Sequence, residues 1–272
     1  MKNKNVLITG STRGLGLEYA KYLSSNGYNI GLTDISENAC TIYGEAKSIE
    51  SILDDLRKNK VEAWFYAADL TNQHETEIMV NKFISKFGVI NGVITNAGGD
   101  IAGRGENAEG GKAKNNTFFI DRHEHENIFD RNYYTCFNVL KSIIPHMKKQ
   151  GFGKVVTVSS VNAVFGVEKE TAYSVAKAGV LQLTRSLAKQ LRKDGINVNC
   201  IMPGPVKTGR FMSTLEGRNE HDLEKINSTS KLDRVANPKD IAPVVEFLLS
   251  EASDFISGEL IRVDGGLFPQ PM

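Results

Sequence analysis

The stretch Asn5-Val6-Leu7-Ile8-Thr9-Gly10-Ser11-Thr12-Arg13-Gly14-Leu15-Gly16 decides the fold, because it predicts a buried strand, a glycine-rich turn and the start of a helix. Gly10 allows a sharp turn, Gly14 lets the backbone approach a phosphate, and Gly16 lets the helix pack on the strand. The unpaired N–H groups and the dipole at the start of that helix both favour an anion. The spacing T-G-x-x-x-G-x-G is a variant of the dinucleotide-binding pattern G-x-G-x-x-G.

Short apolar, β-branched runs alternate with helical patterns along the rest of the chain, which is typical of βαβ units around a buried parallel sheet. We predict strands at Val6–Thr9, Asn29–Thr33, Glu62–Ala67, Gly92–Thr95, Lys154–Ser159, Asn197–Met202 and Glu259–Val263. We predict helices near Gly14–Ser25, Ala46–Lys58, His74–Phe87, Glu124–Lys149, Ala172–Lys193 and Pro238–Ser250. The prediction is therefore an α/β fold: a doubly wound, mostly parallel, seven-stranded Rossmann-type sheet with helices on both faces, forming a single domain over residues 1–272.

Two irregular segments interrupt this alternation: Gly98–Asp121, and Lys207–Leu232 with a candidate short helix at Leu215–Lys225. Both follow the C-terminal ends of strands, where ligands bind in open α/β sheets. We interpret residues 207–232 as a lid over the substrate. Residues 98–121 could have a similar role, but they could equally be a surface excursion or an oligomer contact. The cations in these segments could contact an anionic or polyhydroxy substrate, but we prefer to interpret them as solvated loop charges; they are Arg104, Lys112, Arg210 and Arg218.

The composition argues against several other classes of protein. Lys and Arg total 33 against 32 for Asp and Glu, so the charge balance gives no reason to expect nucleic acid or an anionic membrane as partner. Three distant cysteines without a C-x-x-C pair fit reduced thiols in a cytoplasmic protein. No leader-like or membrane-spanning apolar segment is visible, and His123 and His125 lack a distant third ligand, so no metal site is expected.

Asp34 and Arg13 point to different forms of a dinucleotide. Asp34 ends the second predicted strand, where a carboxylate can accept hydrogen bonds from the adenosine ribose and would repel a 2′-phosphate. Arg13, in the turn, could instead bind that phosphate. Giving Asp34 more weight, we expect NAD rather than NADP as cofactor, although Asp34 could also be an ordinary helix cap before Ser36 and Glu37.

A second motif, Tyr173-Ser174-Val175-Ala176-Lys177, places a phenol and an ammonium one helical turn apart on the same face. A free tyrosine, with a pKa of ~10, is a poor base at neutral pH. A neighbouring ammonium stabilises the phenolate, and we therefore expect Lys177 to lower the pKa of Tyr173 toward the range of a general acid–base group. Ser160, at the end of the fifth predicted strand, can donate a hydrogen bond to a substrate oxygen.

Taken together, these motifs resemble the short-chain dehydrogenase/reductase family in its single-domain branch, from Val6 to Gly266. The matching elements are Thr9–Gly16, Asp69 in Ala68-Asp69-Leu70, Asn96-Ala97-Gly98, Pro203-Gly204 before Thr208, and Val263-Asp264-Gly265-Gly266. Thr95 stands where the family often has a further Asn. By resemblance, Asp69 would bond the adenine ring, the Asn96 motif would support the cofactor ribose, and the element ending in Thr208 would wrap the nicotinamide carboxamide.

The resemblance also implies a catalytic tetrad of Asn132, Ser160, Tyr173 and Lys177, with Ser160 preferred to Ser159 by its spacing to Tyr173. Asn132 would hold a water that links Lys177 to solvent, and Lys177 would bond the nicotinamide ribose. The expected cofactor-binding residues are Gly10, Thr12, Arg13, Gly14, Leu15, Gly16, Asp34, Ile35, Asp69, Leu70, Asn96, Ala97, Gly98, Tyr173, Lys177, Pro203, Gly204, Val206 and Thr208.

The expected function is reversible oxidation of a secondary alcohol to a ketone, with a lean toward a polar small-molecule substrate. A homo-oligomer, dimer or tetramer, is expected by resemblance. An alternative within the same class is an NADPH-dependent reductase of the 3-oxoacyl-carrier-protein type, against which Asp34 argues. An alternative from another class is a regulatory protein that binds the dinucleotide without catalysis, against which the presence of both Tyr173 and Lys177 argues.

Overall fold

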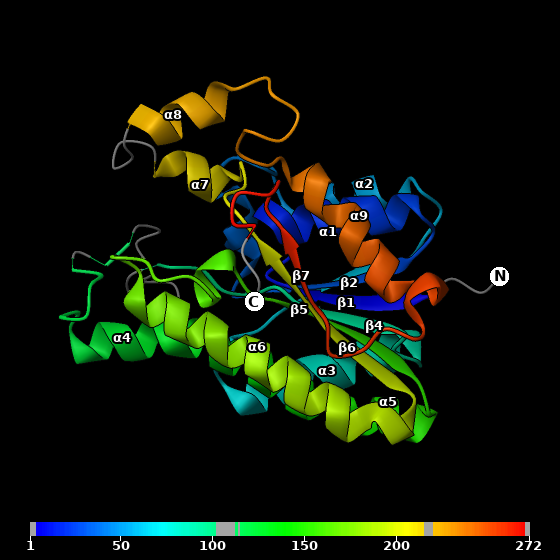
Figure 1. The fold of residues 1–272 in the computed structure, drawn as a ribbon. Coiled ribbons are helices and arrows are strands. Elements are labelled where there is room, and N and C mark those ends of the chain that lie inside the picture. The colour runs from blue at the N-terminus through cyan, green and yellow to red at the C-terminus, as the bar shows by residue number, and fades with distance from the viewer. Residues whose placement is uncertain (1–3, 102–111, 114, 215–219, 270–272) are drawn as a thin grey trace.

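The computed structural model describes residues 4–101, 112–113, 115–214 and 220–269, and these form one seven-stranded sheet flanked by helices (Figure 1). All strand pairs are parallel, in the order β3-β2-β1-β4-β5-β6-β7. The strands are β1 (Asn5–Thr9), β2 (Asn29–Asp34), β3 (Ala63–Ala67), β4 (Gly92–Thr95), β5 (Gly153–Val158), β6 (Ile196–Pro203) and β7 (Leu260–Val263). The predicted doubly wound α/β fold is confirmed, and the sheet is entirely rather than mostly parallel.

Helices cover both faces of the sheet. The helices are α1 (Gly14–Ser25), α2 (Ile49–Arg57), α3 (Gln73–Phe87), α4 (Arg122–Phe129), α5 (Thr135–Gln150), α6 (Thr171–Leu191), α7 (Gly209–Ser213), α8 (Glu220–Asn227) and α9 (Pro238–Leu249). Figure 1 shows α1, α2 and α9 on one face and α3, α5 and α6 on the other. Within β1, Val6 and Ile8 pack in the first layer and Leu7 in the second, as the period of two requires. Both faces are therefore buried, which explains the continuous apolar runs.

Three predicted helices differ in the structure. The helix predicted from Ala46 begins at Ile49, because the Ser48 side chain caps it by accepting from the Ser51 N–H at 3.1 Å. The predicted single helix Glu124–Lys149 is divided by a π-helical turn, Asp130–Tyr134, between α4 and α5. In the segment 207–232, the described part of the candidate helix at Leu215–Lys225 lies in α8, and its first five residues lie outside the described part; the additional helix α7 was not predicted.

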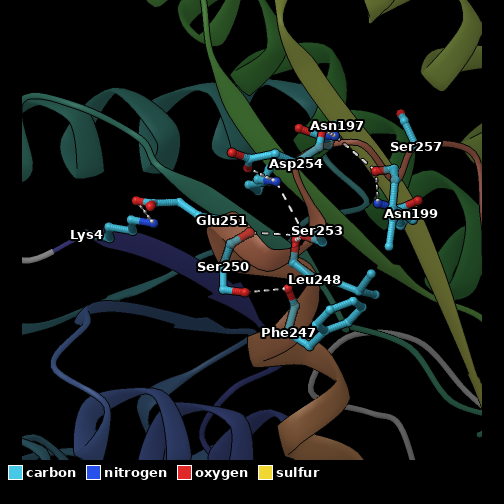
Figure 2. A network of polar contacts seen from close by, with 12 residues as sticks. Lys4, Asn197, Asn199, Phe247, Leu248, Ser250, Glu251, Ser253, Asp254 and Ser257 are labelled. Carbon is cyan, nitrogen blue, oxygen red and sulfur yellow. Dashed lines mark hydrogen bonds and ion pairs between the residues drawn. The ribbon is translucent and has the colours of Figure 1, made fainter.

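A polar network holds the connection from α9 to β7 at the end of the sheet where the parallel strands begin (Figure 2). The Asn197 side chain donates to the carbonyl oxygens of Asp254 and Ile256 at 2.8 and 3.0 Å. Lys154 forms an ion pair with Asp254 at 2.7 Å, and Ser253 donates to the Leu248 carbonyl at 3.0 Å. This network fixes the edge strand β7 and leaves the opposite end of the sheet free for a site. None of the described helices has an apolar stretch long enough to cross a bilayer.

Candidate active site

The sheet order reverses at β1, whose neighbours are β2 on one side and β4 on the other. A cavity of about 340 Å³ opens at the carboxyl ends of these strands, a size that suits a small-molecule site. Most of the predicted site residues line it: Gly10, Arg13, Gly14, Leu15, Asp34, Ile35, Asp69, Leu70, Asn96, Ala97, Gly98, Ser160, Tyr173, Lys177, Pro203, Gly204, Val206 and Thr208. Three predicted residues do not line it; they are Thr12, Gly16 and Asn132.

The turn between β1 and α1 has the geometry that its glycines predict. Gly10 and Gly14 have φ values of +59° and +56°, in the region that glycine tolerates best. A Cβ on Gly16 would lie 2.1 Å from the carbonyl oxygen of Gly10, so a larger residue would push the helix away from the turn. Asn96 closes the turn from β4 by donating to the Gly10 carbonyl at 2.9 Å. The start of α1 therefore borders the cavity, where its N–H groups can bind an anion.

The carboxylate of Asp34 is both a pocket wall and a structural partner of the turn. Its Oδ2 accepts from the Thr12 hydroxyl at 2.7 Å, and its Oδ1 accepts from the Ile35 N–H at 3.0 Å. Thr12 thus acts behind the cavity surface, by holding Asp34 in place. Asp69 is similarly oriented by Thr71, whose hydroxyl donates to Asp69 Oδ1 at 2.7 Å.

Tyr173 and Lys177 extend from α6 into the other end of the same cavity. The Lys177 ammonium lies 5.8 Å from the centre of the Tyr173 ring, and it donates to the Val158 carbonyl at 2.9 Å. Burial lowers the pKa of Lys177 to about 8, because the charged form loses its hydration. Ser160, two residues after β5, is one of the groups that lower the pKa of Tyr173, whereas Ser159 donates to the Lys177 carbonyl at 2.8 Å. The structure thus brings Ser160, rather than Ser159, to the phenol.

The electrostatics of Tyr173 differ from the expectation based on Lys177. Burial raises the pKa of Tyr173, and the groups that oppose this rise are the Arg210 guanidinium and the hydrogen bond with Ser160. The expectation that Lys177 lowers this pKa was wrong: Lys177 is not among the groups that oppose the rise, since its ammonium faces the ring and donates to a backbone carbonyl. Tyr173 next to Arg210 and Ser160 is a partly buried phenol with two groups that favour its anion.

Asn132 lies in the π-helical turn and is almost fully buried. Its amide accepts from the Gly99 N–H at 2.8 Å and donates to the carbonyls of Gly99 and Ile128 at 3.0 and 2.8 Å. These contacts clamp the segment after β4 that borders the cavity. A π-turn adds a residue and redirects side chains, and such turns often occur at functional sites.

Several cavity residues were not predicted from the sequence. Arg210 was interpreted as a solvated charge, and this was wrong: it lines the cavity and donates to the Asp100 carbonyl at 3.2 Å. Lys112, which was interpreted in the same way, forms ion pairs with Asp100 at 3.7 Å and with Glu170. Arg104 and Arg218 lie outside the described residues. Further cavity residues without a recognisable local motif are Tyr43, Glu45, Ile101, Asn127, Asp130, Arg131, Thr135 and Phe211.

Comparison with known proteins identifies the family to which this chain belongs. A family profile described as enoyl-(acyl carrier protein) reductase matches residues 10–268. The chain belongs to the short-chain dehydrogenase/reductase family. A cyclohexanol dehydrogenase of a Rhodococcus species is 30% identical over 98% of this chain and 97% of the relative. The 3-oxoacyl-(acyl-carrier-protein) reductase FabG of Staphylococcus epidermidis is 27% identical over 98% and 99% of the two chains.

Solved structures of the short-chain dehydrogenase/reductase family agree with this assignment. A 7α-hydroxysteroid dehydrogenase complexed with NADH and 7-oxo glycochenodeoxycholic acid has a TM-score of 0.82 and 27% identity, covering 97% of this chain and 93% of that one. Levodione reductase has a TM-score of 0.81 and 26% identity, covering 97% and 96% of the two chains. The protein is thus an oxidoreductase of this family that acts on CH–OH groups, and its fold is one that binds nicotinamide dinucleotides. Among the described residues, no group of three or more His, Cys, Asp or Glu is arranged to hold a metal ion.

Proposed function

We propose that the protein transfers hydride reversibly between NAD and a polar secondary alcohol or ketone, with Tyr173 as the general acid–base group. The observation that carries this proposal is the shared cavity: the glycine-rich turn and the partly buried phenol of Tyr173 both line it. Lys177 lies one helical turn from Tyr173, and Ser160 is hydrogen-bonded to it. A cofactor cradle and a proton-transferring group in one cavity are what a hydride-transfer reaction needs.

The residues around the turn fit a dinucleotide. The exclusion of any side chain at Gly16 and the positive φ angles of Gly10 and Gly14 let the backbone at the start of α1 come close to a pyrophosphate. We assign the adenosine end of the cofactor to Asp34 and Asp69, the pyrophosphate to the glycine-rich turn, and the nicotinamide end to Lys177 and the element from Pro203 to Thr208. A bound nicotinamide supplies the hydride acceptor in oxidation and the hydride donor in reduction.

The side chains divide the proton chemistry among them. In oxidation, Tyr173 takes the hydroxyl proton of the substrate as the carbon–hydrogen bond breaks and the carbonyl forms; in reduction, it returns that proton. Ser160 donates a hydrogen bond to the substrate oxygen. Lys177, which is buried against the Tyr173 ring, is assigned to the ribose of the nicotinamide. Asn132 positions the turn at Gly99, and its role toward a water that links Lys177 to solvent remains part of the proposal.

NAD is proposed over NADP because Asp34 presents a carboxylate where a 2′-phosphate would have to bind. Relatives bind either form: one solved structure is ElxO with NADP bound, at 25% identity and a TM-score of 0.82, and the hydroxysteroid dehydrogenase is complexed with NADH. Values of kcat/KM measured with both cofactors test this preference. We expect NAD to be favoured at least tenfold, and a preference for NADP would contradict the assignment of Asp34.

The decisive experiment is a screen of polar secondary alcohols and ketones, followed at the nicotinamide absorbance, with Tyr173→Phe as the comparison. We expect the wild type to turn over and the variant to lose turnover by about three orders of magnitude or more, because it lacks the proton-transferring hydroxyl. Dinucleotide binding by the variant, measured by fluorescence titration, should stay near that of the wild type. Near-normal turnover in Tyr173→Phe would refute the assignment.

A second candidate is reduction of a 3-oxoacyl group on a carrier protein. The full-length similarity to FabG reductases favours it. A screen that includes a 3-oxoacyl thioester separates the candidates, because the second one requires turnover of that thioester to exceed turnover of the polar alcohols. We further propose that residues 207–232 close over the substrate, that the chain acts as a single domain, and that it forms a homo-oligomer.

A further inference from the structure

The connection between β2 and α2 passes along the edge of the cofactor cavity. We call residues 35–48 the strap. One end of the strap is anchored in the core by Ala39 and Cys40 on a short 3-10 helix, and the other end by Ala46, which packs on the same core layer. Between these anchors, Tyr43 and Glu45 reach the cavity and line it.

Glu45 joins two elements that are far apart in the sequence. Its Oε2 accepts from the N–H of Gly14, at the start of α1, at 2.7 Å. Its Oε1 accepts from the N–H of Gly209, at the start of α7, at 2.8 Å. One carboxylate thus ties the phosphate-binding turn to the first helix of the lid segment.

Two further contacts of the strap lie close to the Glu45 bridge. A Cβ on Gly209 would lie 2.6 Å from the Cβ of Tyr43 and 3.0 Å from the Glu45 carboxyl carbon, so the strap and α7 are in direct contact. The Arg13 guanidinium lies 5.4 Å from the centre of the Tyr43 ring, which adds a cation–π contact between the strap and the turn. The strap therefore contacts both sides of the cavity mouth.

This arrangement has a consequence for any anion that binds at α1. The Gly14 N–H belongs to the helix start that the proposed function assigns to the pyrophosphate, and a carboxylate already occupies it. We infer that the strap is a gate for cofactor binding, with Glu45 as its latch: the carboxylate holds the Gly14 N–H that the pyrophosphate needs, so the dinucleotide binds only after this hydrogen bond opens. This inference rests on the proposed cofactor site.

The test is stopped-flow measurement of NADH association and dissociation by nicotinamide fluorescence. Glu45→Ala removes both hydrogen bonds, and Glu45→Gln removes the charge and can keep only one of the two, because its amide nitrogen is not an acceptor. We expect the association rate constant to rise, by roughly tenfold or more in Glu45→Ala and less in Glu45→Gln, because the hydrogen bond between Glu45 and Gly14 no longer has to break before the cofactor binds. The dissociation rate constant should not rise, because the pyrophosphate has already displaced this hydrogen bond in the complex. Gly209→Ala should also raise the association rate constant, since its methyl group displaces the strap without changing any charge.

The matched control is Glu50→Gln, which makes the same charge change on an exposed position of α2 outside the cavity. It should leave both rate constants at the wild-type values, and thermal unfolding should establish that all variants are folded. Unchanged rate constants in folded Glu45→Ala, or a rise in dissociation alone, would overturn the gate, because the latter identifies Glu45 as a simple binding contact. If the wild type gives no NADH signal at all, the proposed cofactor site fails instead, and the two failures are thus distinguishable.

Discussion

At the scale of single residues, the proposed function depends on the pKa of one phenol. Burial raises the pKa of Tyr173, and the cation that opposes this rise is Arg210 from α7 rather than Lys177 from the same helix. The proposed proton chemistry therefore involves a residue of the segment 207–232, far from Tyr173 in the sequence.

Replacing Arg210 should move the pH profile of the reaction. In Arg210→Met, the loss of a nearby positive charge destabilises the phenolate, so the pKa of Tyr173 rises. Oxidation needs the deprotonated phenol, and its rise in kcat with pH should therefore shift to higher pH. Reduction needs the protonated phenol and should persist to higher pH than in the wild type. Arg210→Lys, which keeps the charge, serves as the control, and identical pH profiles for Arg210→Met and the wild type would show that Arg210 does not tune Tyr173.

At the scale of elements, the π-helical turn between α4 and α5 places Asn132 where it can satisfy three backbone groups at once. The sequence shows a continuous amphipathic pattern there and gives no sign of the extra residue in the turn. The helix start at Gly14, in contrast, can be predicted from the sequence. The spacing of the glycines in the turn indicates directly that turn and helix pack tightly against each other.

Asn132→Ala should lower the free energy of unfolding by about 2–4 kcal/mol, because it leaves the Gly99 and Ile128 backbone groups buried without partners. Urea unfolding measures this change. The control is Asn81→Ala on the exposed side of α3, which should change stability by less than about 0.5 kcal/mol. Equal effects of the two substitutions would mean that the Asn132 contacts contribute nothing to the folded state.

At the scale of the whole molecule, large apolar side chains remain exposed on two parts of the surface. Val175 on α6 is 50% exposed, and Phe255, just before the edge strand β7, is fully exposed. Exposed apolar groups of this size on the outer helices and beside a free sheet edge are typical of surfaces that bind another protein. They support the proposed homo-oligomer.

Light scattering after size-exclusion chromatography should give the mass of a dimer or tetramer. Val175→Asp and Phe255→Asp each place a charge on one of these surfaces, and each should shift the mass toward a smaller species. The exposed, polar substitution Lys169→Gln should leave the mass unchanged. A monomeric wild type at micromolar concentration would contradict the prediction.

The sequence by itself determined the parts of this protein that depend on local chemistry. The period of the apolar residues predicts the strands and most helices, the glycine spacing predicts the phosphate turn, and the Tyr173–Lys177 spacing places two side chains on one helix face. Each of these signals arises within a few residues, since backbone sterics and helix geometry act over that range.

Only the tertiary structure decided which distant charges meet. Glu45 bridges Gly14 and Gly209, and Arg210 approaches Tyr173, across separations in the chain that no local pattern records. The identity of a charged residue says nothing about its partner, because the partner is brought close by the packing of helices on the sheet. Burial then increases the size of its effect, since it removes the water that would otherwise screen the charge.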